Sequence, residues 1–136
     1  MLNEKIKQAE ELHALGHNCA QSVFIPFAEQ FGMDKKTAMR VTEGFGAGMG
    51  NRTQTCGALS GAVAVIGLCY SDGDLKAPAS KATTYEIVGD AVERFRTTCG
   101  STVCQEIKDR QTSGACVSCA DCIAAGVRIA AEAIQK

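Results

Sequence analysis

Residues 56–69 read CGALSGAVAVIGLC, and this stretch predicts a buried helix at the centre of the fold. Its apolar run, Ala58 to Tyr70, is too short to span a bilayer and is interrupted by one serine and two glycines. Gly57, Gly61 and Ala64 fall on one helical face, where small residues let a second helix pack at short range. That second helix could belong to the same chain or to another subunit, so a homodimer is one expectation.

Helical spacing recurs along the whole chain, and no segment alternates as a half-buried strand does over more than a few residues. The 136 residues suit one domain, and with only 5% aromatic residues the core must be filled by aliphatic side chains at close helix separations. We therefore predict an all-α fold, a compact bundle of about six helices over residues 1–136. A glycine-rich loop, Gly44–Gly50, precedes the central helix.

Capping residues mark where the other helices begin. Asn3 is the expected N-cap of the first helix, Asn18 with Gln21 forms a capping box, and Ser118 with Asp121 repeats that pattern. The remaining helices are expected at about residues 4–15, 18–31, 34–43, 81–97, after 101, and 118–135, with a solvated loop over 71–80.

The charge pattern excludes two classes of partner. The formal net charge is −1 and no run of Lys or Arg occurs, which argues against nucleic acid and against a membrane surface. The N-terminus turns polar at once, so we expect no signal peptide, no membrane insertion and a cytoplasmic protein.

The cysteines are the feature that points to chemistry. They are Cys19, Cys56, Cys69, Cys99, Cys104, Cys116, Cys119 and Cys122. Cytosolic thiols are normally reduced, so a cysteine-rich intracellular protein more often binds metal or does redox chemistry than builds disulfides. Four of them, Cys19, Cys56, Cys104 and Cys119, fall in the first turns of four predicted helices, where unpaired N–H groups lower a thiol pKa. Cys69, at the far end of its helix, should be an inert buried thiol.

The C-terminal cluster Cys116, Cys119 and Cys122 has the two-residue spacing of metal sites and redox dithiols. No second Cys-x-x-Cys completes a zinc ribbon, no His follows for covalent haem attachment, and the ferredoxin run is absent. Any cluster would therefore be held by ligands from distant parts of the chain.

Four ordered motifs resemble a known family. They are GHNCAQSV at 16–23, GFGAGMG at 44–50, CGALSG at 56–61 and GSTVC at 100–104. Together they resemble the C_GCAxxG_C_C family of redox-active proteins over nearly the whole chain. The resemblance implies four functional cysteines, the fourth being Cys119 or Cys122, of which Cys119 repeats the helix-start placement. Similar modules fused to multihaem cytochromes imply electron transfer.

The leading hypothesis is an iron–sulfur cluster for electron transfer, held by Cys19, Cys56, Cys104 and Cys119. The redox partner protein is not identified by the sequence, which also leaves open whether the chain is an enzyme.

Two glycines belong to the same hypothesis, since Gly48 and Gly57 would let the backbone lie against the cofactor. The alternatives are a thiol–disulfide oxidoreductase that uses a pair from the 116–122 cluster, a structural zinc ion held by four thiolates, and a helical binding module with incidental cysteines.

Overall fold

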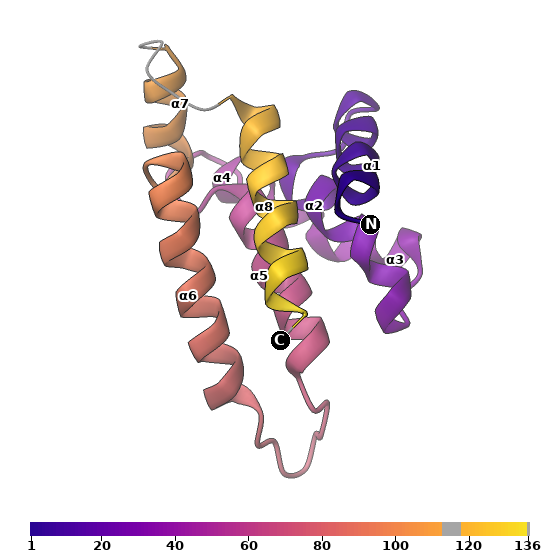
Figure 1. Ribbon diagram of the computed structural model, residues 1–136. Helices are drawn as coiled ribbons and strands as arrows, with labels where there is room; N and C mark the ends of the chain where they lie inside the picture. Colours follow the sequence, from indigo (N-terminus) through magenta and orange to yellow (C-terminus); the bar gives the residue numbers. More distant parts are fainter. Residues whose placement is uncertain (113–117, 136) are drawn as a thin grey trace.

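The computed structural model describes residues 1–112 and 118–135, and this part of the chain is built from helices (Figure 1). They are α1 (Leu2–Ala14), α2 (Cys19–Ala28), α3 (Lys35–Thr42), α4 (Gly46–Met49), α5 (Gly57–Tyr70), α6 (Lys81–Cys99), α7 (Cys104–Thr112) and α8 (Cys119–Ala133), with 3₁₀ turns at Glu29–Phe31 and Glu43–Phe45. No strand occurs within the described residues, where an antiparallel bridge joins Thr55 to Val103. The prediction of an all-α fold is confirmed.

Two predicted capping boxes are present. At the start of α2 the Gln21 N–H donates to Asn18 Oδ1 (2.8 Å), and the Asn18 N–H donates to Gln21 Oε1 (2.9 Å). At the start of α8 the Asp121 N–H donates to Ser118 Oγ (3.1 Å) and the Ser118 N–H to Asp121 Oδ2 (3.3 Å). These boxes fix α2 and α8 to begin at cysteines, because the residue that follows each cap is a cysteine.

The first helix begins earlier in the chain than the predicted N-cap residue. Asn3 was expected to cap it, whereas α1 starts at Leu2 and Asn3 lies inside the first turn. Leu2 is partly buried against the core, so packing extends the helix past the residue with the better capping propensity.

The glycine-rich segment also differs from the expected loop. A 3₁₀ turn leads into α4, a single turn in which Ala47, Gly48 and Met49 have φ values of 51°, 55° and 62°. Ala47 and Met49 carry a Cβ, so this left-handed conformation costs about 1–2 kcal/mol at each of them. The turn is held by the Arg52 N–H, which donates to the Ala47 carbonyl at 2.8 Å.

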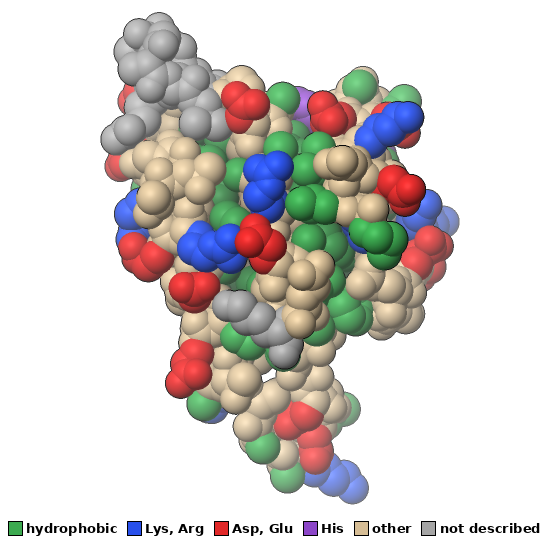
Figure 2. Space-filling model, viewed as in Figure 1, with side chains coloured by type: hydrophobic (Ala, Val, Ile, Leu, Met, Phe, Trp, Pro, Cys, Tyr) green, Lys and Arg blue, Asp and Glu red, His purple; other side chains and the backbone are tan. Residues whose placement is uncertain are grey.

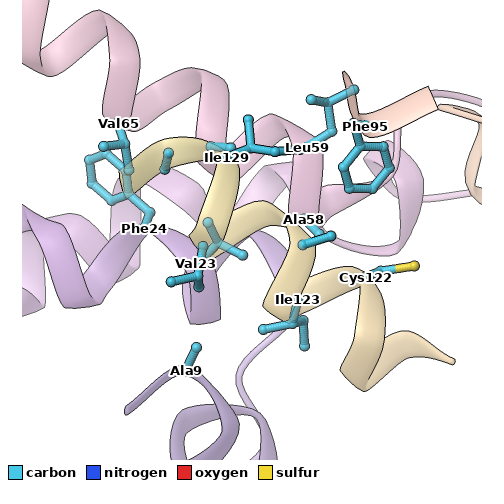
Figure 3. Close-up of a cluster of buried hydrophobic side chains, with 14 of the residues drawn as sticks. Ala9, Val23, Phe24, Ala58, Leu59, Val65, Phe95, Cys122, Ile123 and Ile129 are labelled. Carbon is cyan, nitrogen blue, oxygen red and sulfur yellow. The ribbon is translucent and has the colours of Figure 1, made fainter. Parts of the chain in front are cut away.

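The central helix is α5, which packs against α2, α6 and α8. This helix contributes Leu59 and Val65 to the core, and Figure 3 shows both among buried side chains from α2, α6 and α8. A Cβ placed on Gly61 would lie 2.7 Å from the Ala20 carbonyl oxygen of α2. The glycine face of α5 therefore contacts a helix of the same chain, and a homodimer stays a prediction with no interface assigned.

The two ends of the molecule differ in structure. Figure 1 shows α4, α7 and the beginning of α8 at the end opposite the loop over residues 71–80.

Figure 2 shows Lys and Arg side chains interspersed with Asp and Glu on the face that it views. Among the helices described, none has the length and apolar character needed to cross a membrane.

Candidate functional site

A cavity of about 50 Å³ lies where α2, α5, α7 and α8 begin. It is lined by Cys19, Ala47, Gly48, Cys56, Gly57, Cys104, Ile107, Lys108, Cys119 and Cys122. The structure thus brings together all five cysteines and both glycines singled out from the sequence. Within the described residues, this lining contains no His, Asp or Glu, so its potential ligands are thiols.

Helix starts supply four of these thiols, as the sequence predicts. Cys19, Cys104 and Cys119 are the first residues of α2, α7 and α8, and Cys56 is the N-cap of α5. The four positions are far apart in sequence, and the fold alone makes them neighbours.

Backbone hydrogen bonds tie the beginning of α5 to the beginning of α7. The Cys56 N–H donates to the Thr102 carbonyl (2.8 Å), and the Cys104 N–H donates to the Gln54 carbonyl (2.9 Å). Because each cysteine is bonded through its own backbone N–H, the positions of Cys56 and Cys104 are fixed relative to each other.

The two glycines line the cavity, so their expected place beside a cofactor stays a prediction, and they also pack closely against cysteine side chains. A Cβ on Gly48 would lie 2.3 Å from the Cβ of Cys104, and a Cβ on Gly57 would lie 3.0 Å from the Ala20 nitrogen and 3.3 Å from the Cβ of Cys19. All three distances are shorter than ordinary packing contacts of a Cβ. The glycines therefore make room for the side chains of Cys104 and Cys19, which pack directly against backbone.

The expectation that helix starts lower the thiol pKa values is wrong for Cys19, Cys56 and Cys104. Burial raises the pKa of Cys19 to about 12, and the neighbouring Cys56, Cys119 and Cys104 add to this increase. Burial likewise raises the pKa of Cys104. Lys108 opposes the increase at both thiols through its positive charge. Desolvation and the neighbouring sulfurs raise these pKa values by more than the helix N-termini lower them.

Cys56 shows the two opposing effects on one sulfur. N–H groups of Ala58 and Leu59 donate to it and lower its pKa, which is the predicted contribution of a helix start. Its hydrogen bond with Cys122, followed by burial, raises the pKa by more. The metal-free site therefore holds a protonated Cys56 thiol.

Cys99 was missed by the sequence reasoning. It is 2% exposed at the end of α6, and its side chain is hydrogen-bonded to Cys122, which lowers the Cys99 pKa against the opposing effect of burial. The pKa of Cys122 is about 12, because its bond with Cys56 lowers it while its bond with Cys99 and burial raise it. The sequence feature that could have pointed to Cys99 was its position, because it directly precedes the GSTVC motif.

The remaining cysteines lie elsewhere. Cys69 is half-buried instead of fully buried as expected, and it does not line the cavity. Cys116 lies outside the described residues. Among the described side chains, no group of three or more His, Cys, Asp or Glu is arranged to hold a single metal ion.

Comparison with known proteins identifies one family. The family model described as "Putative redox-active protein (C_GCAxxG_C_C)" matches residues 17–133, a range that contains every cysteine of the cavity. No curated protein and no solved structure gives a match.

Proposed function

Because the chain belongs to the C_GCAxxG_C_C family, we propose that its cavity is a redox centre in which four thiolates hold an iron–sulfur cluster for electron transfer. The ligands in this proposal are Cys19, Cys56, Cys104 and Cys119. One observation carries it, namely that four cysteines from four helix starts line a single small cavity.

The donor chemistry of the cavity fits such a group. Thiolates are the usual ligands of iron–sulfur clusters, and a cluster distributes its ligands over several iron atoms instead of drawing them to one point. Ala58 and Leu59 donate N–H groups to the Cys56 sulfur, and hydrogen bonds of this kind raise the reduction potential of a cluster. The Lys108 side chain offsets part of the negative charge that four thiolates bring.

Cys119 suits the fourth position better than Cys122. The charged form of Cys19 interacts with Cys56, Cys104 and Cys119, so Cys19 lies near the other three proposed ligands. The Cys122 sulfur is instead engaged with Cys56 and Cys99.

The chain's own residues would control protons at this site. Cys19, Cys56 and Cys104 have raised pKa values without metal, so each must lose a proton when it becomes a ligand. The bound cluster would supply one-electron chemistry. Cofactor uptake should accordingly release protons and weaken as the pH falls.

Anaerobic purification with a visible spectrum and analysis of iron, sulfide and zinc tests the proposal. We expect a coloured protein with iron and sulfide, and an electron paramagnetic resonance signal after reduction by dithionite. Ser substitution at Cys56 should remove most of the iron and the colour, while the matched variant Cys69→Ser should keep both, because Cys69 does not line the cavity.

Three outcomes would contradict the proposal. Bound zinc without colour would support a structural zinc site. A colourless, metal-free protein that reduces disulfides would support the oxidoreductase alternative. Equal loss of iron in the Cys56→Ser and Cys69→Ser variants would show that the cavity is not the binding site.

A further inference from the structure

The Asn18 side chain carries an acceptor and a donor, and the capping box uses only the acceptor. Its Oδ1 accepts the Gln21 N–H at 2.8 Å, which is the capping bond at the start of α2. Its Nδ2 donates to the Glu43 carbonyl oxygen at 3.0 Å, and this bond joins the beginning of α2 to a residue 25 positions away. The amide group of Asn18 therefore makes a long-range contact that a helix cap does not require.

The partner of this amide is the glycine turn, residues 43–50, which contains the 3₁₀ turn and α4. The Glu43 carbonyl also accepts the Gly46 N–H, so it lies where the turn begins. A Cβ placed on Gly46 would lie 2.3 Å from Asn18 Nδ2 and 2.6 Å from Asn18 Cγ. Asn18 thus contacts the glycine turn by a hydrogen bond and by direct packing of its amide on the backbone.

The same turn contacts Cys104, because α4 packs on both α2 and α7 (Figure 1). A Cβ on Gly48 would lie 2.3 Å from the Cβ of Cys104 and 3.1 Å from its sulfur. Gly46 and Gly48 are both buried. The turn is therefore packed between Asn18 on one side and Cys104 on the other.

Backbone hydrogen bonds hold the far side of the glycine turn. The Arg52 N–H donates to the Ala47 carbonyl at 2.8 Å, and the Gln105 N–H of α7 donates to the Arg52 carbonyl at 3.0 Å. A side-chain substitution does not remove these bonds. A substitution at Asn18 can therefore release the anchor to α2 while the anchor to α7 stays in place.

We propose that Asn18 is a positioning residue for the four-thiol site, because its amide group holds the glycine turn against α2 and thereby keeps Gly48 in contact with Cys104. Asn18 also directly precedes Cys19, so one residue fixes the placement of two proposed ligands. This inference rests on the proposed function in taking the thiol-lined cavity as the site. It adds the residue that holds two sides of that cavity together.

The strained backbone of the glycine turn explains why it needs this anchor. Ala47 and Met49 have φ values of 51° and 62°, and such conformations persist only where the surroundings hold them. When the Asn18 amide is absent, the turn opens more often and uncovers Cys104. The loss of one neutral hydrogen bond corresponds to a change of about fivefold in such an opening equilibrium.

Two substitutions separate the anchor from the cap. Asn18→Ser and Asn18→Asp both keep a side-chain oxygen for the Gln21 N–H, and Ser and Asp cap helices about as well as Asn. Neither keeps the amide group that donates to the Glu43 carbonyl. Ser118→Ala is the matched control, because it removes the cap of α8 and leaves Asn18 unchanged.

The measurement is native-state alkylation by iodoacetamide in the reduced, metal-free full chain. Cys99 and Cys104 share a tryptic peptide, so fragmentation of that peptide gives the labelling of each. Cys99 is 2% exposed and does not line the cavity, so its labelling reports unfolding of the whole chain. The ratio of Cys104 to Cys99 labelling should rise about fivefold in both Asn18 variants and stay at the wild-type value in Ser118→Ala.

An unchanged ratio in either Asn18 variant would overturn the inference, and so would an equal rise in Ser118→Ala, which would show that loss of a cap is sufficient. In iron-loaded protein, Asn18→Ser should also alter the electron paramagnetic resonance line shape, because Cys104 is displaced. The alkylation result does not depend on a cluster. A raised ratio in a chain that binds no iron contradicts the proposed function alone, whereas an unchanged ratio in a chain that binds iron contradicts only the role of Asn18.

Discussion

At the scale of single residues, the site is shaped by what surrounds each sulfur. A helix start lowers a thiol pKa, and Ala58 and Leu59 do so at Cys56, but burial and the other thiols act over the whole cavity and dominate. The protonated thiols are stable in the metal-free chain because an isolated buried thiolate would be costly. A cation is therefore needed before several of these sulfurs can ionise together.

Gly48 is the residue whose substitution should disturb the site most directly. In Gly48→Ala the new Cβ would lie 2.3 Å from the Cβ of Cys104, and the left-handed backbone (φ 55°) would add strain. We expect a loss of about 1–3 kcal/mol in the free energy of unfolding, together with displacement of Cys104 and loss of bound iron. Urea denaturation and alkylation of Cys104, followed by mass spectrometry, measure both effects.

Gly50 provides the matched control. Its φ is also positive, at 91°, but a Cβ there would meet nothing within 4 Å. Gly50→Ala should therefore show backbone strain alone, with the reactivity of Cys104 and the iron content unchanged. If both variants expose Cys104 equally, the contact between Gly48 and Cys104 does not position that thiol.

At the scale of secondary-structure elements, close contacts at glycines set how the helices cross. Gly61 of α5 lies against the Ala20 carbonyl of α2, and Gly126 of α8 lies against the Ala58 carbonyl of α5. These contacts hold the beginnings of α2 and α8 beside the beginning of α5. The cysteines that begin α2 and α8 are thereby placed at one cavity.

Gly61→Ala tests the contact between α5 and α2. The added Cβ would lie 2.7 Å from a backbone oxygen, which cannot rotate away, so we expect destabilisation by about 1–3 kcal/mol. Gly67→Ala, in the same helix, meets nothing within 4 Å and should stabilise the chain by up to about 1 kcal/mol. Thermal unfolding of both variants measures the difference. Equal stabilities would show that the glycine face of α5 is not tightly packed.

Local signals explain why the elements could be predicted from the sequence. Asn18 and Ser118 cap helices as expected, since capping depends on residues within one turn. The left-handed turn at Ala47–Met49 could not be predicted, because Gly48 in it packs closely against Cys104, which is distant in sequence. Cys99 was missed for the same reason, as only the packing of α6 on α8 brings it to Cys122.

At the scale of the whole molecule, the fold gathers five of its thiols at one end. The core of α2, α5 and α8 is filled by aliphatic and aromatic side chains, and the cavity opens where these helices begin. The sequence predicted the five cysteines that line the cavity. The protonation states of these thiols could not be predicted, because they depend on how deeply each thiol is buried and on how close the thiols lie to one another.

The raised pKa values make the stability of the metal-free chain depend on pH. Cys19 and Cys122 have pKa values of about 12 when folded, against about 8.5 for an unfolded thiol. Above about pH 8.5 the unfolded chain therefore binds fewer protons than the folded chain, and stability falls with rising pH. Each thiol contributes at most about 1.4 kcal/mol per pH unit, and Lys5, whose pKa burial lowers, acts in the opposite direction.

Urea denaturation of the reduced, metal-free chain between about pH 8 and pH 10 measures this dependence. The free energy of unfolding should decrease across the interval. In Cys19→Ser the decrease should be smaller, because one of the thiols whose pKa is raised in the folded chain is gone. Cys69→Ser is the comparison outside the cavity, and it removes a thiol whose pKa burial also raises. A wild type whose stability is constant or rises between these pH values would show that the cavity does not keep its thiols protonated.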